Sequence, residues 1–219
     1  MENETTFARQ LDLCPPDRLA FPITLIGAGA IGSAVALTLA KMGCTDITVF
    51  DHDILEEHNI PNQICRPDKI GMKKTEALAG LIDDLCGVKI TSRGVKYVGQ
   101  RLSKLVIVAV DSIEARGRIW VSVVKMKRSV DLLIDCRMGA EVGRVFAVRP
   151  YDFDAASDYA DTLHPAEESE RLPCSARSII YCPSALSAIV ASLIKRYAMN
   201  ERFPGEVLID MANMSVFAP

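Results

Sequence analysis

The seven cysteines of this 219-residue chain include no Cys-x-x-Cys pair. Their number is odd and their spacings are wide, since they stand at positions 14, 44, 65, 86, 136, 174 and 182. A disulfide framework and a structural zinc site made of four cysteines are therefore both disfavoured. So many unpaired thiols suit a reducing compartment, and we expect the cytoplasm.

Long apolar runs and long basic runs are also missing. The longest apolar stretches, 21–32 and 105–110, are too short to cross a bilayer, and the polar, acidic segment 1–10 does not have the pattern of a signal peptide. The formal net charge is −3, and the densest basic stretch, 125–128, is brief. We therefore expect no membrane association, and nucleic acid is disfavoured as a partner.

Short β-branched stretches alternate with Ala- and Leu-rich stretches along much of the chain. The first kind predicts buried strands and the second kind predicts helices. The predicted strands are 23–27, 46–51, 88–92, 104–110, 131–136 and 142–149, and the predicted helices are 30–42, 71–85, 112–127 and 184–199. Such alternation is typical of an α/β fold with a doubly wound, mostly parallel sheet.

One long segment interrupts this alternation. Residues 151–173 show little apolar periodicity and carry seven acidic side chains. A loop of this length inside a compact domain is usually functional or mobile, and we expect a mobile loop here.

A glycine-rich turn, Gly27-Ala-Gly29-Ala-Ile-Gly32, follows the first predicted strand and opens the first predicted helix. Gly27 permits a tight turn, Gly29 lets a phosphate approach the backbone, and Gly32 lets the helix pack on the sheet. The free N–H groups at the start of the helix attract an anion. Asp51 ends the second strand, where its carboxylate can accept hydrogen bonds from a ribose. On these residues alone, NAD is the expected nucleotide.

Three further segments favour ATP instead. DHDILEEHNIPNQ at 51–63, GMKK at 71–74 and VAVDSIEAR at 108–116 resemble the D-x-D-x-V-x-x-x-N-l-x-R-Q, G-x-x-K and C-x-D-n-x-x-x-R motifs of the MoeB/ThiF/ubiquitin-activating superfamily. The resemblance is strong over 23–116 and weaker afterwards. It implies a Rossmann-like fold of ThiF type with a C-terminal antiparallel extension. It also implies one ATP-binding adenylation domain over 1–219, in which 151–173 is the crossover loop.

The resemblance implies a role for each matching residue. Asp51 would bind the ribose of ATP, Asn59 the phosphate region, Lys74 the phosphates, and Asp111 a Mg²⁺ ion beside the triphosphate. Lys73 would take the place of Lys74 if the register of the motif slips by one. The rest of the nucleotide site is drawn from the same motifs, namely Asp53, Asn62 and Ser112. Such cations and donors stabilise the charge that develops when a carboxylate attacks the α-phosphate.

The chain departs from the family pattern at two points. Asn62 stands where the family has an arginine, so one cation expected at the triphosphate is missing. Arg9, in Phe7-Ala-Arg9-Gln10, resembles the family's N-terminal R-Q element, which in dimeric relatives reaches the ATP of the partner subunit. The alternative is that Arg9 is an exposed side chain on a loose N-terminus. The zinc-binding Cys-x-x-Cys pairs of the MoeB and ThiF branch are absent as well, which suggests a compact, zinc-free member of bacterial or phage type.

Cys174, in Pro-Cys-Ser-Ala-Arg177, resembles the segment around the transfer cysteine of ubiquitin-activating enzymes. A nearby Arg177 or a helix N-terminus would lower the pKa of its thiol and so favour a nucleophilic thiolate. The alternative is a small buried hydrophobic residue, which is the usual role of a free cysteine. Cys182 is the nearest rival for the transfer role, whereas Cys44 and Cys136 are expected in the core.

The leading hypothesis is ATP-dependent adenylation of the C-terminal carboxylate of a ubiquitin-like or sulfur-carrier protein, with Cys174 as a candidate thioester acceptor. A conjugating enzyme is a further candidate partner, and we expect a homodimer. The alternatives are adenylation of a tRNA base or a peptide, a nucleotide-binding subunit without catalysis, and an NAD-dependent oxidoreductase. The last of these has no recognisable His, Lys or Tyr arrangement to support it.

Overall fold

The structure is a computed structural model and describes residues 6–163 and 178–218. One eight-stranded sheet has the order β3-β2-β1-β4-β5-β6-β7-β8. The strands are β1 (Ile23–Ile26), β2 (Ile47–Phe50), β3 (Thr91–Arg93), β4 (Leu105–Val108), β5 (Leu132–Gly139), β6 (Val142–Val148), β7 (Glu206–Asp210) and β8 (Ser215–Phe217). The helices are α2 (Ala30–Met42), α3 (Lys74–Cys86), α4 (Ile113–Lys125), α5 (Phe153–Asp161) and α6 (Tyr181–Ala198), with short 3-10 turns η1 (Pro16–Leu19), η2 (Glu57–Asn59) and η3 (Pro67–Lys69).

The sheet has a parallel part and an antiparallel part. The strands from β3 to β5 are parallel to one another, whereas β5, β6, β7 and β8 pair antiparallel. This arrangement confirms the predicted mostly parallel α/β fold with an antiparallel extension. Because β1 lies between β2 and β4, the chain turns from one side of the sheet to the other at β1 and β4. Ligands of open α/β sheets bind beyond the carboxyl ends of the strands at such a switch point.

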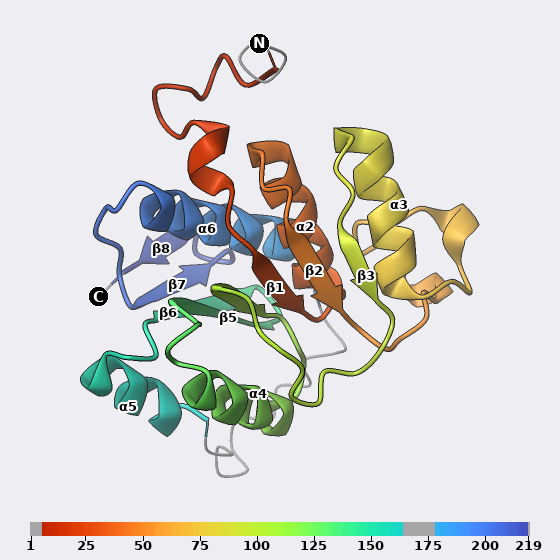
Figure 1. The fold of residues 1–219 in the computed structure, drawn as a ribbon. Coiled ribbons are helices and arrows are strands. Elements are labelled where there is room, and N and C mark those ends of the chain that lie inside the picture. The colour runs from red at the N-terminus through yellow and green to blue at the C-terminus, as the bar shows by residue number, and fades with distance from the viewer. Residues whose placement is uncertain (1–5, 164–177, 219) are drawn as a thin grey trace.

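Helices cover both faces of the sheet (Figure 1). Alternate side chains of β4 point to opposite faces, so Leu105 and Ile107 join the apolar cluster under α2, α3 and α6, while Val106 and Val108 join the cluster under α4 and α5. Each fully buried aliphatic side chain of this kind contributes about 1.5–3 kcal/mol to folding. Strand β4 is therefore apolar along its whole length, and the helices on both faces of the sheet pack over it.

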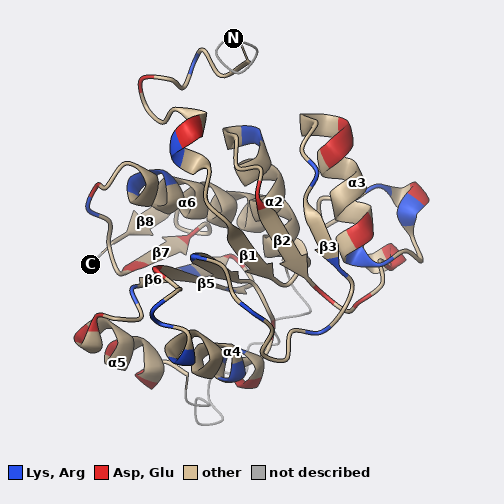
Figure 2. Ribbon diagram, viewed as in Figure 1, with Lys and Arg blue, Asp and Glu red and all other residues tan. Residues whose placement is uncertain are grey.

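The predicted loop 151–173 is wrong in its first part. Phe153–Asp161 forms helix α5, and the Asp152 carboxylate caps it by accepting a hydrogen bond from the Ala155 N–H at 3.2 Å. One face of α5 is made of alanines and Tyr159, which pack against the core below. Small residues give a weak periodic signal, and the acidic residues along α5 (Figure 2) obscure it further. Residues 164–173 lie outside the described residues.

Other boundaries differ from prediction by a few residues. Helix α3 starts at Lys74 rather than at 71, because Gly71 has a φ of +91° that a helix does not allow. Helix α6 starts at Tyr181, so Pro183 falls in its first turn, where proline is tolerated. Helix α2 ends at Met42, as predicted, and Gly43 follows it with a φ of +104° that terminates the helix. Among the described residues, no helix has the length and apolarity to cross a membrane.

Candidate functional site

The three glycines of the turn between β1 and α2 meet different demands. Gly27 has a φ of +103°, and a Cβ added there would lie 2.4 Å from the Ala109 carbonyl oxygen. A Cβ added at Gly32 would lie 1.9 Å from the Gly27 carbonyl oxygen. A Cβ added at Gly29 would meet nothing within 4 Å. The fold therefore requires glycine at 27 and 32, while the space over Gly29 is open to a ligand, as the phosphate-binding prediction demands.

Asp51 fixes this turn from the end of β2. Its carboxylate accepts hydrogen bonds from the Ala28 N–H at 2.7 Å and from the Asp53 N–H at 2.9 Å, one on each oxygen. An ionised carboxylate offers about four acceptor positions, so two remain for ligand hydroxyls. The predicted ribose residue is thus also a structural tie between β2 and the glycine turn.

Lys74 lies beside Asp53. Its Nζ is 2.8 Å from Asp53 Oδ2, and its backbone N–H donates to the Asp53 carbonyl at 3.0 Å. The Lys74 side chain is 11% exposed and the Asp53 side chain 51%. The hydrogen bond from Lys74 lowers the pKa of Asp53 below its ordinary value. Lys74 is therefore nearly buried in an ion pair whose other member, Asp53, is half exposed to solvent.

The structure also separates Lys74 from Lys73. The Lys73 Nζ donates to the His52 carbonyl at 2.6 Å, and its side chain passes close to Gly94. Lys74, in contrast, lines a hollow of about 230 Å³ together with Asp53, Ile54, Glu56, His58 and Asn59. Of these two lysines, Lys74 therefore faces the hollow and Lys73 does not.

Asn59 is the buried member of this hollow. Its Oδ1 accepts the Glu56 N–H at 3.0 Å, while the Glu56 side chain accepts the Asn59 N–H in return. This reciprocal cap holds η2 in place. Among the described residues no acceptor contacts the NH₂ group of Asn59, which leaves it as a donor for the hollow.

Asn62 stands where the family pattern has an arginine, and it contacts the segment before α6. Its Nδ2 donates to Ser178 Oγ, and its Oδ1 is a buried acceptor with no hydrogen-bond partner within the described part of the chain. The segment also docks on α2, because the Ile64 N–H donates to Ser33 Oγ at 2.9 Å. Asn62 thus connects the loop after β2 to the start of α6 and supplies no charge.

Asp111 follows β4 and is exposed. The next residue, Ser112, is the N-cap of α4, and its Oγ accepts the Ala115 N–H at 3.2 Å. Ser112 therefore has a helix-capping contact besides its predicted role at the nucleotide. Mg²⁺ is commonly held by one or two carboxylates together with substrate phosphates and water, so a single exposed carboxylate at this edge fits such an ion.

A second group of side chains could hold a metal ion by its geometry. The ligand atoms of Asp51, His52 and Asp53 lie within 4.8 Å of one another. The Asp51 oxygens already accept two backbone N–H groups, and Asp53 is paired with Lys74. These contacts disfavour a cation at that group.

Sequence analysis missed a buried ionic cluster beneath this edge. Asp135 in β5 is fully buried and is contacted by Arg116 of α4 and Arg137 of β5. In the sequence Asp135 follows three apolar residues, and its charge at the end of that run is the signal that could have marked it. Arg137 is a partner two residues away, whereas Arg116 meets Asp135 only in the folded chain.

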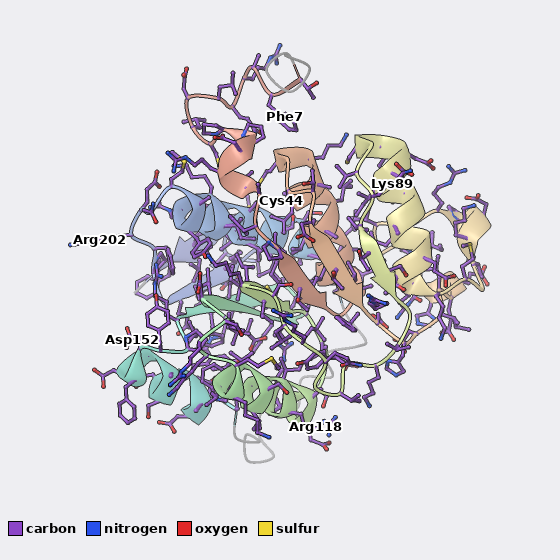
Figure 3. The ribbon with its side chains drawn as sticks, viewed as in Figure 1. Phe7, Cys44, Lys89, Arg118, Asp152 and Arg202 are labelled. Atoms are coloured by element: carbon purple, nitrogen blue, oxygen red, sulfur yellow. The ribbon has the colours of Figure 1, made fainter. Side chains whose placement is uncertain are left out.

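Arg9 belongs to a segment at the C-terminal end of α2, opposite the end that carries the glycine turn. Gln10 Nε2 donates to the Met42 carbonyl at 2.8 Å, and Phe7 contacts the position of Gly43, close to Cys44 (Figure 3). Helix α2 has 13 residues and is therefore about 20 Å long. Within one chain, Arg9 is thus not brought to the glycine turn.

The cysteine predictions have separate outcomes. Cys174 lies outside the described residues. Cys182 is buried, and burial raises the pKa of its thiol, which disfavours it as the rival nucleophile. Burial raises the pKa of Cys44 and of Cys136 to about 12, and both lie in the core as predicted.

A larger hollow of about 420 Å³ lies away from these residues. It is lined by side chains that include Lys104 and Asp131, which precede β4 and β5. It therefore opens at the amino end of the sheet, opposite the glycine turn, and none of the predicted site residues lines it.

The ThiF family model matches residues 19–200 of this chain. The ubiquitin-like modifier-activating enzyme 5 of Arabidopsis thaliana is 35% identical over 57 residues, which cover 26% of this chain and 13% of that protein. The NEDD8-activating enzyme E1 catalytic subunit of Dictyostelium discoideum is 32% identical over 109 residues, which cover 47% of this chain and 24% of that protein. The matches thus span less than a quarter of the length of these two curated relatives.

PaaA and MccB are among the solved structures that share the fold. PaaA superposes with a TM-score of 0.76 at 18% identity, covering 100% of this chain and 73% of PaaA. E. coli MccB, solved with ATP, superposes with a TM-score of 0.73 at 14% identity, covering 93% of this chain and 65% of MccB. At these identities the likeness establishes the arrangement of helices and strands.

Proposed function

The chain belongs to the ThiF family, and from that premise we propose that it binds ATP at the carboxyl edge of β1, β2 and β4 and adenylates a carboxylate. The observation that carries the proposal is the convergence at one edge of an open glycine turn, a cation beside a hollow, and an exposed aspartate. These are Gly29, Lys74 and Asp111. A hydride-transferring dehydrogenase has no need of the last two.

The residues divide the work of binding. Asp51 uses its two remaining acceptor positions for the ribose hydroxyls. The start of α2 and the open face of Gly29 receive the phosphates, because free N–H groups at a helix N-terminus attract anions. Asn59 and Lys74 donate to the same phosphates from the hollow. Asp111 would hold Mg²⁺, which supplies positive charge beside the phosphate oxygens.

In the reaction, a carboxylate oxygen of the acceptor forms a bond to the α-phosphorus of ATP. The bond from that phosphorus to the bridging oxygen of the β-phosphate breaks, and pyrophosphate leaves with the bond's electron pair. Lys74 stabilises the charge on the phosphate oxygens by leaving Asp53 for the nucleotide. The exposure of Asp53 allows this exchange, because water can solvate the carboxylate that is left behind.

We further propose that the acceptor is the C-terminal carboxylate of a small protein or peptide. A ubiquitin-like or sulfur-carrier protein is the first candidate, because two relatives are activating enzymes for such modifiers. A peptide is the second, because MccB has been solved with MccA. Thioester transfer to Cys174, a homodimer with Arg9 acting across its interface, and a conjugating enzyme as a further partner are finer parts of the same proposal.

The nucleotide part is tested by thermal unfolding. ATP with Mg²⁺ should raise the midpoint, whereas NAD and NADP at the same concentration should not, because only a ligand of the native state stabilises it. Asp51→Ala should weaken ATP binding with or without metal, while Asp111→Ala should weaken it only with metal. Stabilisation by NAD alone would overturn the proposal.

A further inference from the structure

A buried ionic cluster lies behind the turn that presents Asp111. The Arg116 guanidinium donates through Nη1 to Asp135 Oδ1, and through Nη2 to the carbonyls of Val110 and Cys136, the latter at 2.9 Å. Arg116 is 5% exposed and Asp135 is fully buried. One side chain of α4 thus connects a carboxylate of β5 to the residue immediately before Asp111.

The other oxygen of Asp135 has its own partners. Arg137 Nε donates to Oδ2 at 2.8 Å, and the Tyr159 hydroxyl donates to it at 3.1 Å. The Arg137 guanidinium also donates to the carbonyl and the hydroxyl of Thr162, at 3.0 and 2.8 Å, and lies 4.5 Å from the centre of the Phe146 ring. Each oxygen of the carboxylate therefore has its own donors.

Stability alone gives no reason for such a cluster. Burying Asp135 and Arg116 costs several kcal/mol per ion in desolvation, and apolar residues of the same volume would often serve the fold equally well. What the charges add is a single geometry, since a guanidinium and a carboxylate bond in fixed directions. Positioning of nearby backbone is the function that this property allows.

The backbone at Val110 needs that positioning. Strand β4 ends at Val108, the Ala109 N–H still donates to the Ile26 carbonyl at 2.8 Å, and α4 begins only at Ile113. Between these two elements, Arg116 holds the Val110 carbonyl, and the Ser112 cap holds the start of α4. The direction of the Asp111 side chain depends on this short link.

We propose that Asp135 is a positioning residue which acts through Arg116 to aim the Asp111 carboxylate at the metal beside the nucleotide. The proposal rests on the proposed metal role of Asp111. Residues that orient metal ligands by hydrogen bonds typically contribute tenfold or more to metal affinity. Asp135 therefore contributes to metal binding without touching the ion or the nucleotide.

The test compares the dissociation constant of ATP in Mg²⁺ with that in EDTA, measured by calorimetry. Asp135→Asn keeps the shape of the side chain and removes its charge. We expect it to reduce by roughly tenfold the tightening of ATP binding that Mg²⁺ causes, and to leave the EDTA value within about twofold. Tyr159→Phe is the matched control, because it removes one bond to Asp135 and leaves Arg116 in place. It should retain the full effect of Mg²⁺.

The same substitution in an Asp111→Asn background separates the possible failures. If Asp135 acts through Asp111, Asp135→Asn should have no further effect there. A further loss in that background, or a loss in EDTA equal to that in Mg²⁺, would overturn the inference. An unchanged Mg²⁺ effect in Asp111→Asn alone would overturn the metal role and the inference together. Should Asp135→Asn fail to fold, Arg116→Lys, which cannot reach Asp135 and both carbonyls at once, should give the same loss.

Discussion

The Asp53–Lys74 pair at the open edge of the sheet differs from the Asp135–Arg116 pair below it in exposure to water. Half of the Asp53 side chain is exposed, whereas Asp135 has no contact with solvent. A ligand can replace Asp53 as the partner of Lys74 at little cost, because water screens the carboxylate charge that remains. Separation of the buried pair would leave an uncompensated charge in the core. The open pair is therefore suited to exchange partners during binding, and the buried pair is suited to hold geometry.

The largest expected effect comes from removing the buried carboxylate. Asp135→Ala leaves two guanidinium groups close together without their shared partner, and we expect it to lower the free energy of unfolding by about 3–5 kcal/mol. Urea denaturation measures this loss. Arg144→Ala is the control, because its ion pair with Glu206 is half exposed and should contribute less than about 1 kcal/mol. Equal losses in the two variants would remove the contrast between buried and open pairs.

Lys74→Ala should lower activity strongly and change stability little. We expect the rate of adenylation to fall by about 10²–10³, as when one donor to the developing charge is removed. The free energy of unfolding should change by no more than about 1 kcal/mol. Lys73→Ala is the matched control, since its Nζ contacts the His52 carbonyl and not the hollow. A similar loss of rate in both variants would show that the lysines had been assigned wrongly.

In the glycine turn, a single added methyl group should affect stability at one position and ATP binding at another. Gly32→Ala forces a Cβ against the Gly27 carbonyl, so we expect it to destabilise the fold by about 1–3 kcal/mol. Gly29→Ala meets no neighbour, and its effect on stability should stay within about 0.5 kcal/mol. It should nevertheless weaken ATP binding, because the added methyl occupies the space proposed for phosphate. Chemical denaturation and calorimetry measure the two effects, and normal ATP affinity in Gly29→Ala would contradict the placement of the phosphates.

The smallest effect concerns pH. Lys74 lowers the pKa of Asp53 in the folded protein, so this group contributes stability above the ordinary Asp value of 3.8. That contribution is lost as pH falls from about 4 through the lowered folded value. Asp53→Asn should therefore flatten the decline in stability of the wild type in this range. Superimposable declines would show that the pair adds nothing measurable, as is common for exposed ion pairs.

The glycine turn could be predicted from the sequence alone. The spacing of its three glycines directly after a strand specifies both the shape of the backbone and its place at the edge of the sheet. Lys74 and Asp111 could be found only through resemblance, since a lysine or an aspartate in a loop has no periodic signature. Asp135 was missed because its partners Arg116 and Tyr159 are 19 and 24 residues away and meet it only in the folded chain. The contact of Asn62 with Ser178, 116 residues apart, was hidden for the same reason. Helix α5 was missed because alanines mark a buried face weakly.

The central claim is most directly tested by the exchange of labelled pyrophosphate into ATP, with a ubiquitin-like protein, a sulfur-carrier protein or a short peptide as the carboxylate acceptor. Reversible adenylation predicts exchange that requires ATP, Mg²⁺ and a free C-terminal carboxylate on the acceptor. The exchange should be lost in Lys74→Ala and retained in Lys73→Ala. Exchange of equal rate in the two lysine variants, or exchange with an acceptor whose C-terminus is amidated, would contradict the account.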